Sequence, residues 1–382
     1  MYGQNTIEDV WTFELAAPQK NSIATAMTKF SESRALLVVV ELRDGSFGIG
    51  EAGTGHTGQA SRTIPALRAL IEGPYKSMLI GQPLNVTGLR RKLESAFKLE
   101  FRGIGAAAMS GIDIALWDLF AKTLDRPLCE VLGGGSRPVI VYATGGHYRD
   151  AADGWSLEEE MRSYVDAGFN SVKMKVGGAS ARVDFERVSA VRAAIGPHIG
   201  LAADASYAMT PKQAVAFSSQ IEPLGIDFFE APVALNNVAG LAEVRERSPL
   251  PIAGNELAST LMAFKEYVLG GCLDYVQPSL SMCGGITEAI RIAALASAFS
   301  LPVTLQSSGS SVATLASAHF AAAIPDVHSF ELNQVHKGLT GQLHEEPLTL
   351  VDGRVAPPTA PGLGVTASLA ELRAFRSVER AL

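Results

Sequence analysis

The chain has 382 residues, of which 47% are hydrophobic and 19% charged, and its formal net charge is −7. This composition indicates a folded globular protein that is long enough for a barrel and a second domain. The acidic balance and the absence of a basic cluster exclude nucleic acids and anionic membranes as expected partners. The sequence contains neither an apolar run of 18 residues nor a signal-peptide pattern, so we expect no membrane span.

The three cysteines, Cys129, Cys272 and Cys283, show no paired spacing. Such unpaired cysteines are typical of proteins from a reducing compartment, and we expect a cytoplasmic protein. We expect all three to be small buried residues without a chemical role.

The first part of the chain predicts an α+β domain over residues 1–132. Residues 35–42 and 47–52 are apolar runs that flank Arg43-Asp44-Gly45-Ser46, which is a β-hairpin pattern with an Asp-Gly turn. Residues 64–132 then show helical periodicity. This part does not resemble the repeating units that follow it.

After the break at Gly133-Gly134-Gly135, an apolar run followed by a helical stretch repeats at intervals of about 25 residues. The predicted strands are 139–144, 171–176, 199–203, 226–229, 251–254, 275–279, 303–306 and 329–332. This alternation is typical of a (β/α)8-type barrel, which we place at residues 138–332. Residues 333–382 leave the pattern, and we expect them to return to the first domain.

Three acidic residues end successive strands of this repeat. Asp204, Glu230 and Glu256 are equally spaced, because 230 − 204 and 256 − 230 both give 26. Carboxylates at the C-terminal ends of neighbouring strands would meet on one rim of the barrel, where their oxygens suit Mg²⁺. The alternative is that each acid caps the helix that follows its strand.

Two lysines precede this series in the strand at 171–176. Lys173 and Lys175 are two residues apart, so both point to one face of the strand. With Val172, Met174 and Val176 facing the helices, the lysine face is the barrel interior. Buried lysines require nearby carboxylates, substrate or water. The alternative is an edge strand whose lysines are solvated.

The whole chain resembles the enolase superfamily, in particular its mandelate racemase and muconate lactonizing enzyme branch. The segments that carry this resemblance, in this order, are Gly111–Leu119, Pro127-Leu128, Leu132–Gly134, Lys173–Lys175, the three spaced carboxylates, Gly284–Ala289 and Pro361–Gly364. The resemblance implies a modified TIM barrel of the (β/α)7β type and an α+β capping domain built from both chain ends. It also implies Mg²⁺ on Asp204, Glu230 and Glu256, and a homo-oligomer.

The chemistry that this superfamily shares is removal of the proton alpha to a carboxylate, which produces an enediolate. By resemblance, Lys175 is the base. Lys173 would lower the pKa of Lys175 and contact a substrate carboxylate oxygen. Glu331 matches the position that hydrogen-bonds the carboxylate from the far side, a role that calls for a raised pKa.

The sequence departs from the family pattern at two positions. Relatives carry a second acid or base after the sixth and seventh strands, and these positions are Ser279 and Gln306 here. Neither side chain titrates near pH 7. Two-base racemisation is therefore less expected than β-elimination or cycloisomerisation with one base. Gln306 could hold a substrate hydroxyl or merely pack, and the sequence leaves this open.

Further polar residues belong to the predicted rim. His147 follows the first barrel strand, where it could supply the missing acid or lie in a loop in water. His56 lies in a glycine-rich loop of the capping domain and is a candidate for substrate choice. Ser206 and Asn255 are candidates for supporting the metal. Asn255 also occupies a position where the lactonizing branch carries a ligand, which Glu256 provides here.

Two further histidines, His319 and His336, lie in different sequence surroundings. His319 lies in alanine-rich helical sequence and is expected to be packed. His336 follows the last strand and could reach the pocket mouth.

Taken together, these features predict a Mg²⁺-dependent lyase that dehydrates a small carboxylate substrate, either an acid sugar or a related hydroxy acid. A cycloisomerase, epimerase or racemase of the same superfamily would share all these residues. A non-catalytic carboxylate-binding relative is the alternative from another class, motivated by Ser279 and Gln306.

Overall fold

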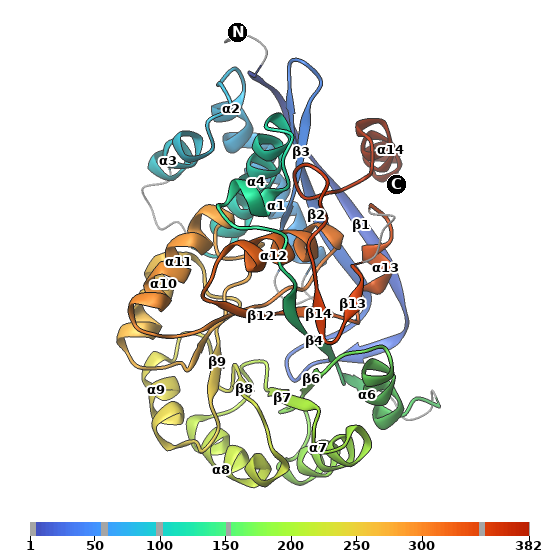
Figure 1. The fold of residues 1–382 in the computed structure, drawn as a ribbon, viewed down its shortest axis with the longest axis vertical. Helices are drawn as coiled ribbons and strands as arrows, with labels where there is room; N and C mark the ends of the chain where they lie inside the picture. Colours follow the sequence, from blue (N-terminus) through green and yellow to red (C-terminus); the bar gives the residue numbers. More distant parts are fainter. Residues whose placement is uncertain (1–4, 55–59, 97–101, 150–153, 344–347, 382) are drawn as a thin grey trace.

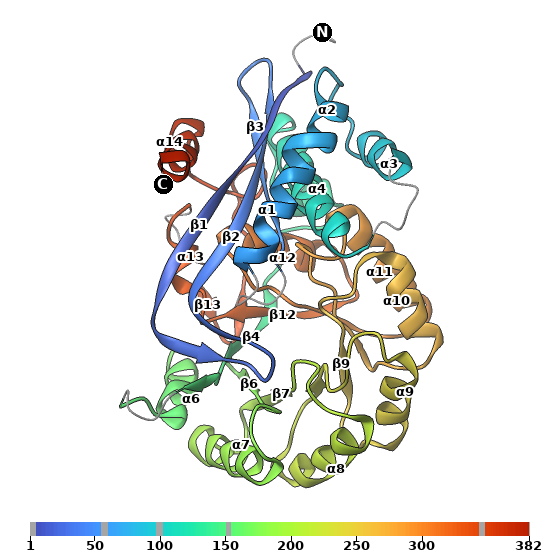
Figure 2. The same ribbon diagram turned by 180° about the vertical axis from the view of Figure 1, so that it is seen from behind.

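We describe the protein from a computed structural model, in which residues 5–54, 60–96, 102–149, 154–343 and 348–381 are described. A barrel forms the lower half of the molecule in Figure 1, and a capping domain of one sheet and several helices lies above it. The two halves meet where the long first hairpin runs down beside the barrel, as Figure 2 shows from behind.

The barrel is a closed parallel sheet. Its strands are β4 (Val139–Gly145), β6 (Ser171–Lys175), β7 (Gly200–Asp204), β8 (Phe229–Glu230), β9 (Ile252–Gly254), β10 (Tyr275–Val276), β11 (Val303–Leu305) and β12 (Val327–Asn333). They pair in chain order, and β12 pairs with β4 to close the ring. This confirms the predicted barrel, although several strands are only two or three residues long.

A helix connects each barrel strand to the next. The helices are α6 (Leu157–Asp166), α7 (Ala181–Ile195), α8 (Pro211–Ile221), α9 (Val238–Arg247), α10 (Thr260–Leu269), α11 (Ile286–Ala298) and α12 (Ser311–Ala323), with a short 3₁₀ turn, η4 (Glu222–Leu224), after α8. Side chains of Ser156, Ser180, Thr210, Asn237 and Ser310 cap five of them. The eight strands and seven helices confirm the (β/α)7β architecture.

The capping domain is built on an antiparallel sheet in the order β3-β2-β1-β5. Its strands are β1 (Ile7–Ala24), β2 (Lys29–Leu42), β3 (Phe47–Ala52) and β5 (Tyr148–Arg149), the last of which follows barrel strand β4. Its helices are α1 (Ala60–Leu70), η2 (Ile71–Tyr75), α2 (Lys76–Leu79), α3 (Val86–Ala96), α4 (Ile104–Thr123) and α5 (Leu128–Val131). Helix α4 packs closely on the sheet, since a Cβ at Gly50 would lie 2.0 Å from the carbonyl oxygen of Gly111.

Helix α4 is long and apolar enough to cross a membrane by length and composition alone. Within this fold, however, 78% of its most apolar window is buried. It packs against strands β3 and β2. The helix is therefore the core helix of the capping domain.

The C-terminal segment is divided between the two domains. The hairpin of β13 (Leu350–Val351) and β14 (Arg354–Val355) pairs with barrel strand β4. Helices α13 (Lys337–Thr340) and α14 (Leu369–Ala381) instead pack against β1.

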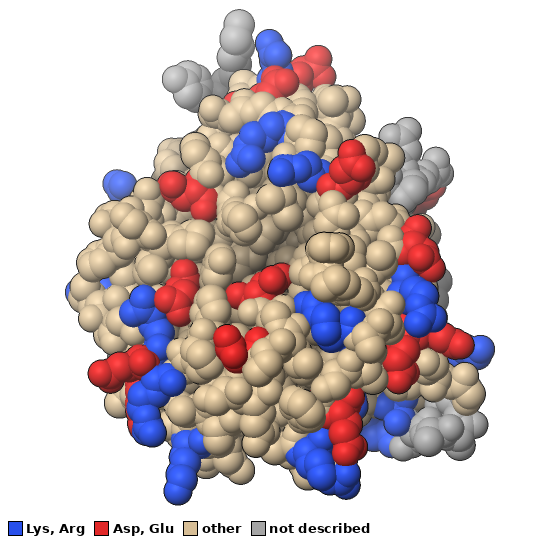
Figure 3. All heavy atoms as spheres, turned by 60° about the horizontal axis from the view of Figure 1, so that its bottom comes forward, with Lys and Arg blue, Asp and Glu red and all other residues tan. Residues whose placement is uncertain are grey.

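Charged side chains of both signs intermingle on the face drawn in Figure 3, and this face is hollowed near its centre. The end of β1 reaches the barrel because Ile23 and Ala24 pair with Arg149 and Tyr148 of β5. The turn after β1 can therefore contribute to a pocket at the barrel mouth.

Candidate active site

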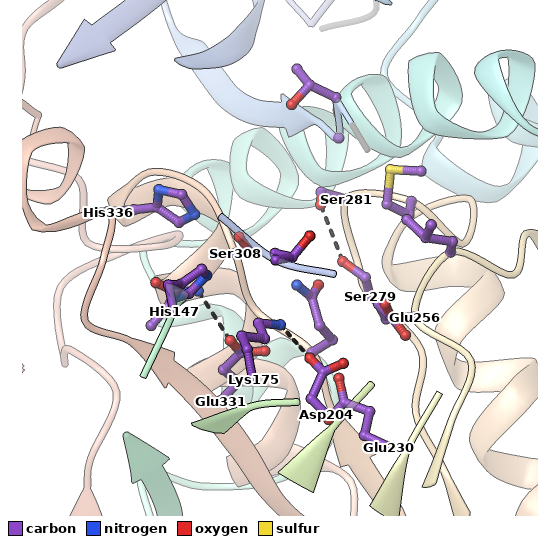
Figure 4. Close-up of a pocket in the computed structure, with 17 residues that line it drawn as sticks. His147, Lys175, Asp204, Glu230, Glu256, Ser279, Ser281, Ser308, Glu331 and His336 are labelled. Carbon is purple, nitrogen blue, oxygen red and sulfur yellow. Dashed lines mark hydrogen bonds and ion pairs between the residues drawn. The ribbon is translucent and has the colours of Figure 1, made fainter. Parts of the chain in front are cut away.

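A polar pocket lies where the C-terminal ends of the barrel strands meet the capping domain (Figure 4). The barrel strands and the loops that follow them line most of it, and the capping domain contributes its remaining wall. The lining residues are Thr25, Gly53 and Thr54 from the capping domain, and His147, Lys175, Asp204, Glu230, Glu256, Leu257, Ser279, Ser281, Met282, Gln306, Ser308, Glu331, Asn333 and His336 from the barrel side.

Strand register brings the charged side chains together. Lys175 is the register partner of Asp204, and Asp204 is that of Glu230. Glu256 follows two residues after the end of β9. The three carboxylates are not helix caps, because the residues at the N-caps of α8, α9 and α10 are Thr210, Asn237 and Ser259. The capping alternative for these acids is thus wrong.

Lys173 lies inside the barrel, with 1% of its side chain exposed. Its Nζ is 2.6 Å from Oε2 of Glu230 and 3.5 Å from Oε2 of Glu331. Burial lowers the pKa of this ammonium, but Glu230 and Glu331 outweigh burial and raise its pKa well above the ordinary value. Lys173 is therefore a fixed positive charge, and the alternative of a solvated edge strand is wrong.

Lys175 forms an ion pair with Asp204. Burial and the nearby Lys173 lower the pKa of Lys175, as expected, but Asp204 reverses the sum and raises it. Burial acts to raise the pKa of Asp204, yet Lys175 and Lys173 hold it well below its usual range. A base at Lys175 would require this ion pair to be weakened, because the base form of lysine is the neutral amine.

Burial and the neighbouring carboxylates disfavour the charged forms of the other two rim carboxylates. Burial raises the pKa of Glu230 to about 8 against the opposing effect of Lys173, and Asp204 and Glu256 add to the rise. Burial likewise raises the pKa of Glu256, with a further contribution from Asp204. The Tyr207 hydroxyl donates to Glu256 at 2.6 Å. Mutual repulsion of this kind is relieved by a bound cation.

Asp204, Glu230 and Glu256 fit Mg²⁺ by donor chemistry, since all three present hard carboxylate oxygens to one pocket. In the described part of the chain they are not gathered as a ready-made three-ligand cage. Asp204 and Glu230 are instead paired with the two lysines. The ammonium groups thus balance the charge that a divalent cation would otherwise balance.

The two predicted supporting residues are buried and do not line the pocket. The backbone N–H of Ser206 donates to Oδ1 of Asp204 at 2.7 Å, and its hydroxyl lies 3.1 Å from the same oxygen. Asn255 is buried and directly precedes Glu256. Its Oδ1 has no hydrogen-bond partner among the described residues.

Ser279 and Gln306 lie side by side in the pocket wall, where a bridge joins their backbones. The Ser279 hydroxyl is 3.2 Å from that of Ser281. This part of the wall thus presents neutral hydroxyl and amide groups where relatives are expected to carry titrating ones.

His147 and His336 line the same pocket, and both are buried. Both rings pack against Phe30 of the capping domain, with centroid distances of 6.0 and 6.4 Å. Burial, with Lys175 nearby, lowers the pKa of both imidazoles, that of His336 to about 4. The alternative that His147 lies in water is therefore wrong. His56 lies outside the described residues.

Sequence patterns did not single out several lining residues. Ser281, Met282 and Ser308 belong to loops after strands, and the turn residue Thr25 comes from the capping domain. A strand-end position was the available signal for the loop residues, since rim loops of a barrel line its site. Thr25 lies in the stretch from Asn21 to Lys29, where the resemblance implies a loop that sets substrate choice, and the pairing of β1 with β5 brings this stretch to the pocket.

The chain matches two family descriptions. Residues 7–133 match the mandelate racemase / muconate lactonizing enzyme N-terminal domain, and residues 156–371 match the enolase C-terminal domain-like family. Together these two matches cover both the capping domain and the barrel.

Characterised relatives span nearly the full length. An arabinonate dehydratase of Saccharolobus solfataricus is 30% identical over 94% of this chain and 96% of its own. A D-galactarolactone cycloisomerase of Agrobacterium fabrum is 32% identical over 92% of this chain and 94% of its own.

Solved structures of the same superfamily superpose closely on this chain. A superfamily member from a Polaromonas species has a TM-score of 0.88 at 31% identity and covers 97% of each chain. A Bradyrhizobium enolase complexed with magnesium and mandelic acid has a TM-score of 0.85 at 28% identity, covering 98% of this chain and 99% of that one. The chain belongs to the enolase superfamily, in its mandelate racemase and muconate lactonizing enzyme branch.

Proposed function

We propose that this protein is a Mg²⁺-dependent dehydratase of small hydroxy-carboxylates, with acid sugars as the first substrate class. The observation that carries the proposal is the placement of Lys175 in a polar pocket that three strand-end carboxylates also line. Lys173 does not line this pocket but is buried next to it, paired with Glu230. Relatives that dehydrate arabinonate, gluconate, xylonate and galactarate support this substrate class.

In this proposal, two lysines and a glutamate have different roles in forming the enediolate. The neutral amine of Lys175 takes the proton from the carbon alpha to the substrate carboxylate. Lys173, a fixed positive charge paired with Glu230, would stabilise the negative charge that grows on the substrate carboxylate in the enediolate. Glu331, which lies 3.5 Å from Nζ of Lys173 and lines the pocket, would hydrogen-bond the same carboxylate from the far side.

Asp204, Glu230 and Glu256 would hold the metal. When bound, Mg²⁺ would supply the positive charge that stabilises the enediolate and releases Lys175 from its ion pair with Asp204.

The enediolate then loses its β-hydroxyl as water. The electron pair of the enediolate forms the Cα–Cβ double bond, the Cβ–O bond breaks, and the departing hydroxide takes up the proton that Lys175 removed, which leaves water and restores the neutral amine. The enol that results becomes a 2-keto acid when its β-carbon takes a proton from water. His147 lies in the pocket close enough for its pKa to be lowered by Lys175, and we propose that it stabilises the departing oxygen.

A cycloisomerase is the second candidate function. It is favoured by the 32% identity to the D-galactarolactone cycloisomerase and by the neutral Ser279 and Gln306, which leave the site with a single lysine base. The two activities differ in product, since a dehydratase releases a 2-keto acid and a cycloisomerase retains the formula of its substrate. Incubation with aldonic and aldaric acids and their lactones, followed by mass spectrometry of the products, tests the dehydratase, which should give a product lighter by one water. A product of unchanged formula from a lactone would favour the cycloisomerase.

A further inference from the structure

A chain of hydrogen bonds runs from the capping domain to a histidine of the pocket. The amide nitrogen of Gln19 on β1 donates to Oγ of Ser33 on β2 at 2.6 Å and to the carbonyl oxygen of Val335 at 2.9 Å. Oγ of Ser33 then lies 2.7 Å from Nδ1 of His336. The carbonyl acceptor fixes which end of the Gln19 amide carries hydrogen, because only the NH₂ end can donate to it.

The donor-to-acceptor direction of these hydrogen bonds determines which ring nitrogen of His336 carries the hydrogen. Ser33 has a single hydroxyl hydrogen, and it already accepts one from Gln19. If Nδ1 of His336 also donated to Ser33, the Ser33 hydrogen would have no acceptor among the described hydrogen bonds, in a residue that is 0% exposed. Leaving a buried donor unpaired is unfavourable, because the group loses its hydrogen bonds to water without gaining another. Ser33 therefore donates to Nδ1, and the ring hydrogen lies on Nε2.

His336 lies where its Nε2–H can donate a hydrogen bond to a ligand in the pocket. Its ring lines the pocket together with Lys175 and Gln306, and its stacking against Phe30 holds the ring plane. In the view of Figure 4, His336 and His147 lie on one side of Lys175, while Asp204 and Glu256 lie on the other. A substrate bound over Lys175 would thus have the carboxylates at one end and the histidines at the other.

We propose that His336 is a neutral imidazole whose Nε2–H donates a hydrogen bond to an oxygen of the bound substrate, in an orientation set by Ser33 and Gln19. This rests on the proposed function, which supplies a hydroxylated carboxylate as the ligand. His336 donates a hydrogen bond and transfers no proton, because loss of Nε2–H would leave an imidazolate. The low pKa of His336 agrees with a neutral ring at pH 7.

The consequence is a substrate preference. An oriented donor in a buried wall discriminates against a ligand that lacks the matching oxygen, since the buried N–H would remain unpaired. The site is therefore built for carboxylates that carry a hydroxyl or second carboxylate at the end away from the metal-binding group. Gln19 and Ser33 act through His336 and are positioning residues.

The first test measures the tautomer and needs no substrate. In protein labelled with ¹⁵N-histidine, NMR distinguishes the protonated from the unprotonated ring nitrogen of His336, with His336→Gln used to assign its signals. We expect the hydrogen on Nε2 in the wild type at pH 7 and a mixture of tautomers in Ser33→Ala. A hydrogen on Nδ1 in the wild type would overturn the inference, whatever the enzyme's reaction proves to be.

The second test uses the substrate identified by screening. Ser33→Ala should lower kcat/KM about tenfold, Ser33→Thr should retain most of it because the hydroxyl remains, and exposed Ser31→Ala is the matched control. His336→Gln, which keeps a donor near the Nε2 position, should retain more activity than His336→Leu. Equal losses in Ser33→Ala and Ser33→Thr, or in His336→Gln and His336→Leu, would contradict an oriented donor.

Discussion

The carboxylate of Glu51 lies 2.6 Å from Oγ of Ser310 and joins strand β3 of the capping domain to the first turn of barrel helix α12. The same carboxylate accepts the backbone N–H groups of Ser310 and Ala313. Glu51 is buried, with 2% of its surface exposed. Because Gln306 and Ser308 of the pocket precede α12, this contact ties the two domains at the edge of the site.

Replacing Glu51 by Ala should destabilise the protein by about 2–4 kcal/mol, since three buried donors lose their acceptor. Glu51→Gln keeps one acceptor oxygen and should lose less than Glu51→Ala. Urea unfolding of both variants measures the difference, with exposed Glu186→Ala as the control. If Glu51→Ala were as stable as the wild type, the carboxylate would not hold α12.

Lys175→Ala should abolish turnover, by roughly 10³-fold or more, because no other described residue is placed as the base. The variant should still bind Mg²⁺, since all three carboxylates remain. The exposed Lys265→Ala on α10 serves as the matched control and should keep full activity. Turnover near the wild-type rate in Lys175→Ala would disprove the base assignment.

Glu256→Gln should remove most Mg²⁺ affinity while both lysine ion pairs remain, because Asp204 and Glu230 pair with the lysines whereas Glu256 accepts a hydrogen bond from Tyr207. Calorimetric titration with Mg²⁺ measures the affinity, and the Mg²⁺-induced rise in Tm gives a second readout. Treatment with EDTA should abolish activity of the wild type. Unchanged Mg²⁺ binding in Glu256→Gln would place the metal elsewhere.

His319 should make the fold sensitive to acid. It is 0% exposed in α12, and the backbone N–H of Cys129 donates to its Nδ1. Burial lowers the pKa of His319 from 6.5 to about 4. The folded state therefore binds fewer protons than the unfolded state between these values, so its contribution is present above pH 6.5 and is lost as the pH falls toward 4.

The size of this effect is roughly 3 kcal/mol by pH 4, from about 1.4 kcal/mol per pKa unit. His319→Gln should flatten the dependence of the free energy of unfolding on pH between 6.5 and 4, whereas exposed His198→Asn should not. Urea titrations at several pH values provide the comparison. Parallel pH profiles for His319→Gln and the wild type would show that His319 titrates normally.

Much of the barrel could be predicted because three of its strands are followed by acidic residues at equal spacing. The apolar run before each of Asp204, Glu230 and Glu256 can be read directly from neighbouring residues, and so can the spacing between the three acids. The first strand, β1, was not predicted, although it is 18 residues long. Pro18 interrupts it, and its pairing with β2 rather than its own pattern defines it.

The site was predictable where it lies on strand ends and not where distant segments converge. His147 and His336 are far apart in sequence, and they meet because both pack on Phe30 of the first hairpin. Sequence periodicity contains no information on such a meeting point. The net pKa shift of Lys175 was likewise beyond prediction, since it depends on whether Asp204 or Lys173 exerts the larger effect.

The central claim is that Lys175, in a Mg²⁺ site, removes the proton alpha to a carboxylate and a β-hydroxyl then leaves. The most direct measurement is mass spectrometry of purified protein with Mg²⁺ in D₂O, incubated with a library of acid sugars, hydroxy acids and lactones. The account predicts a product that has lost one water and gained one carbon-bound deuterium from the solvent. A library in which no compound loses water or exchanges its alpha hydrogen, while Mg²⁺ binds, would contradict it and favour a non-catalytic carboxylate-binding protein.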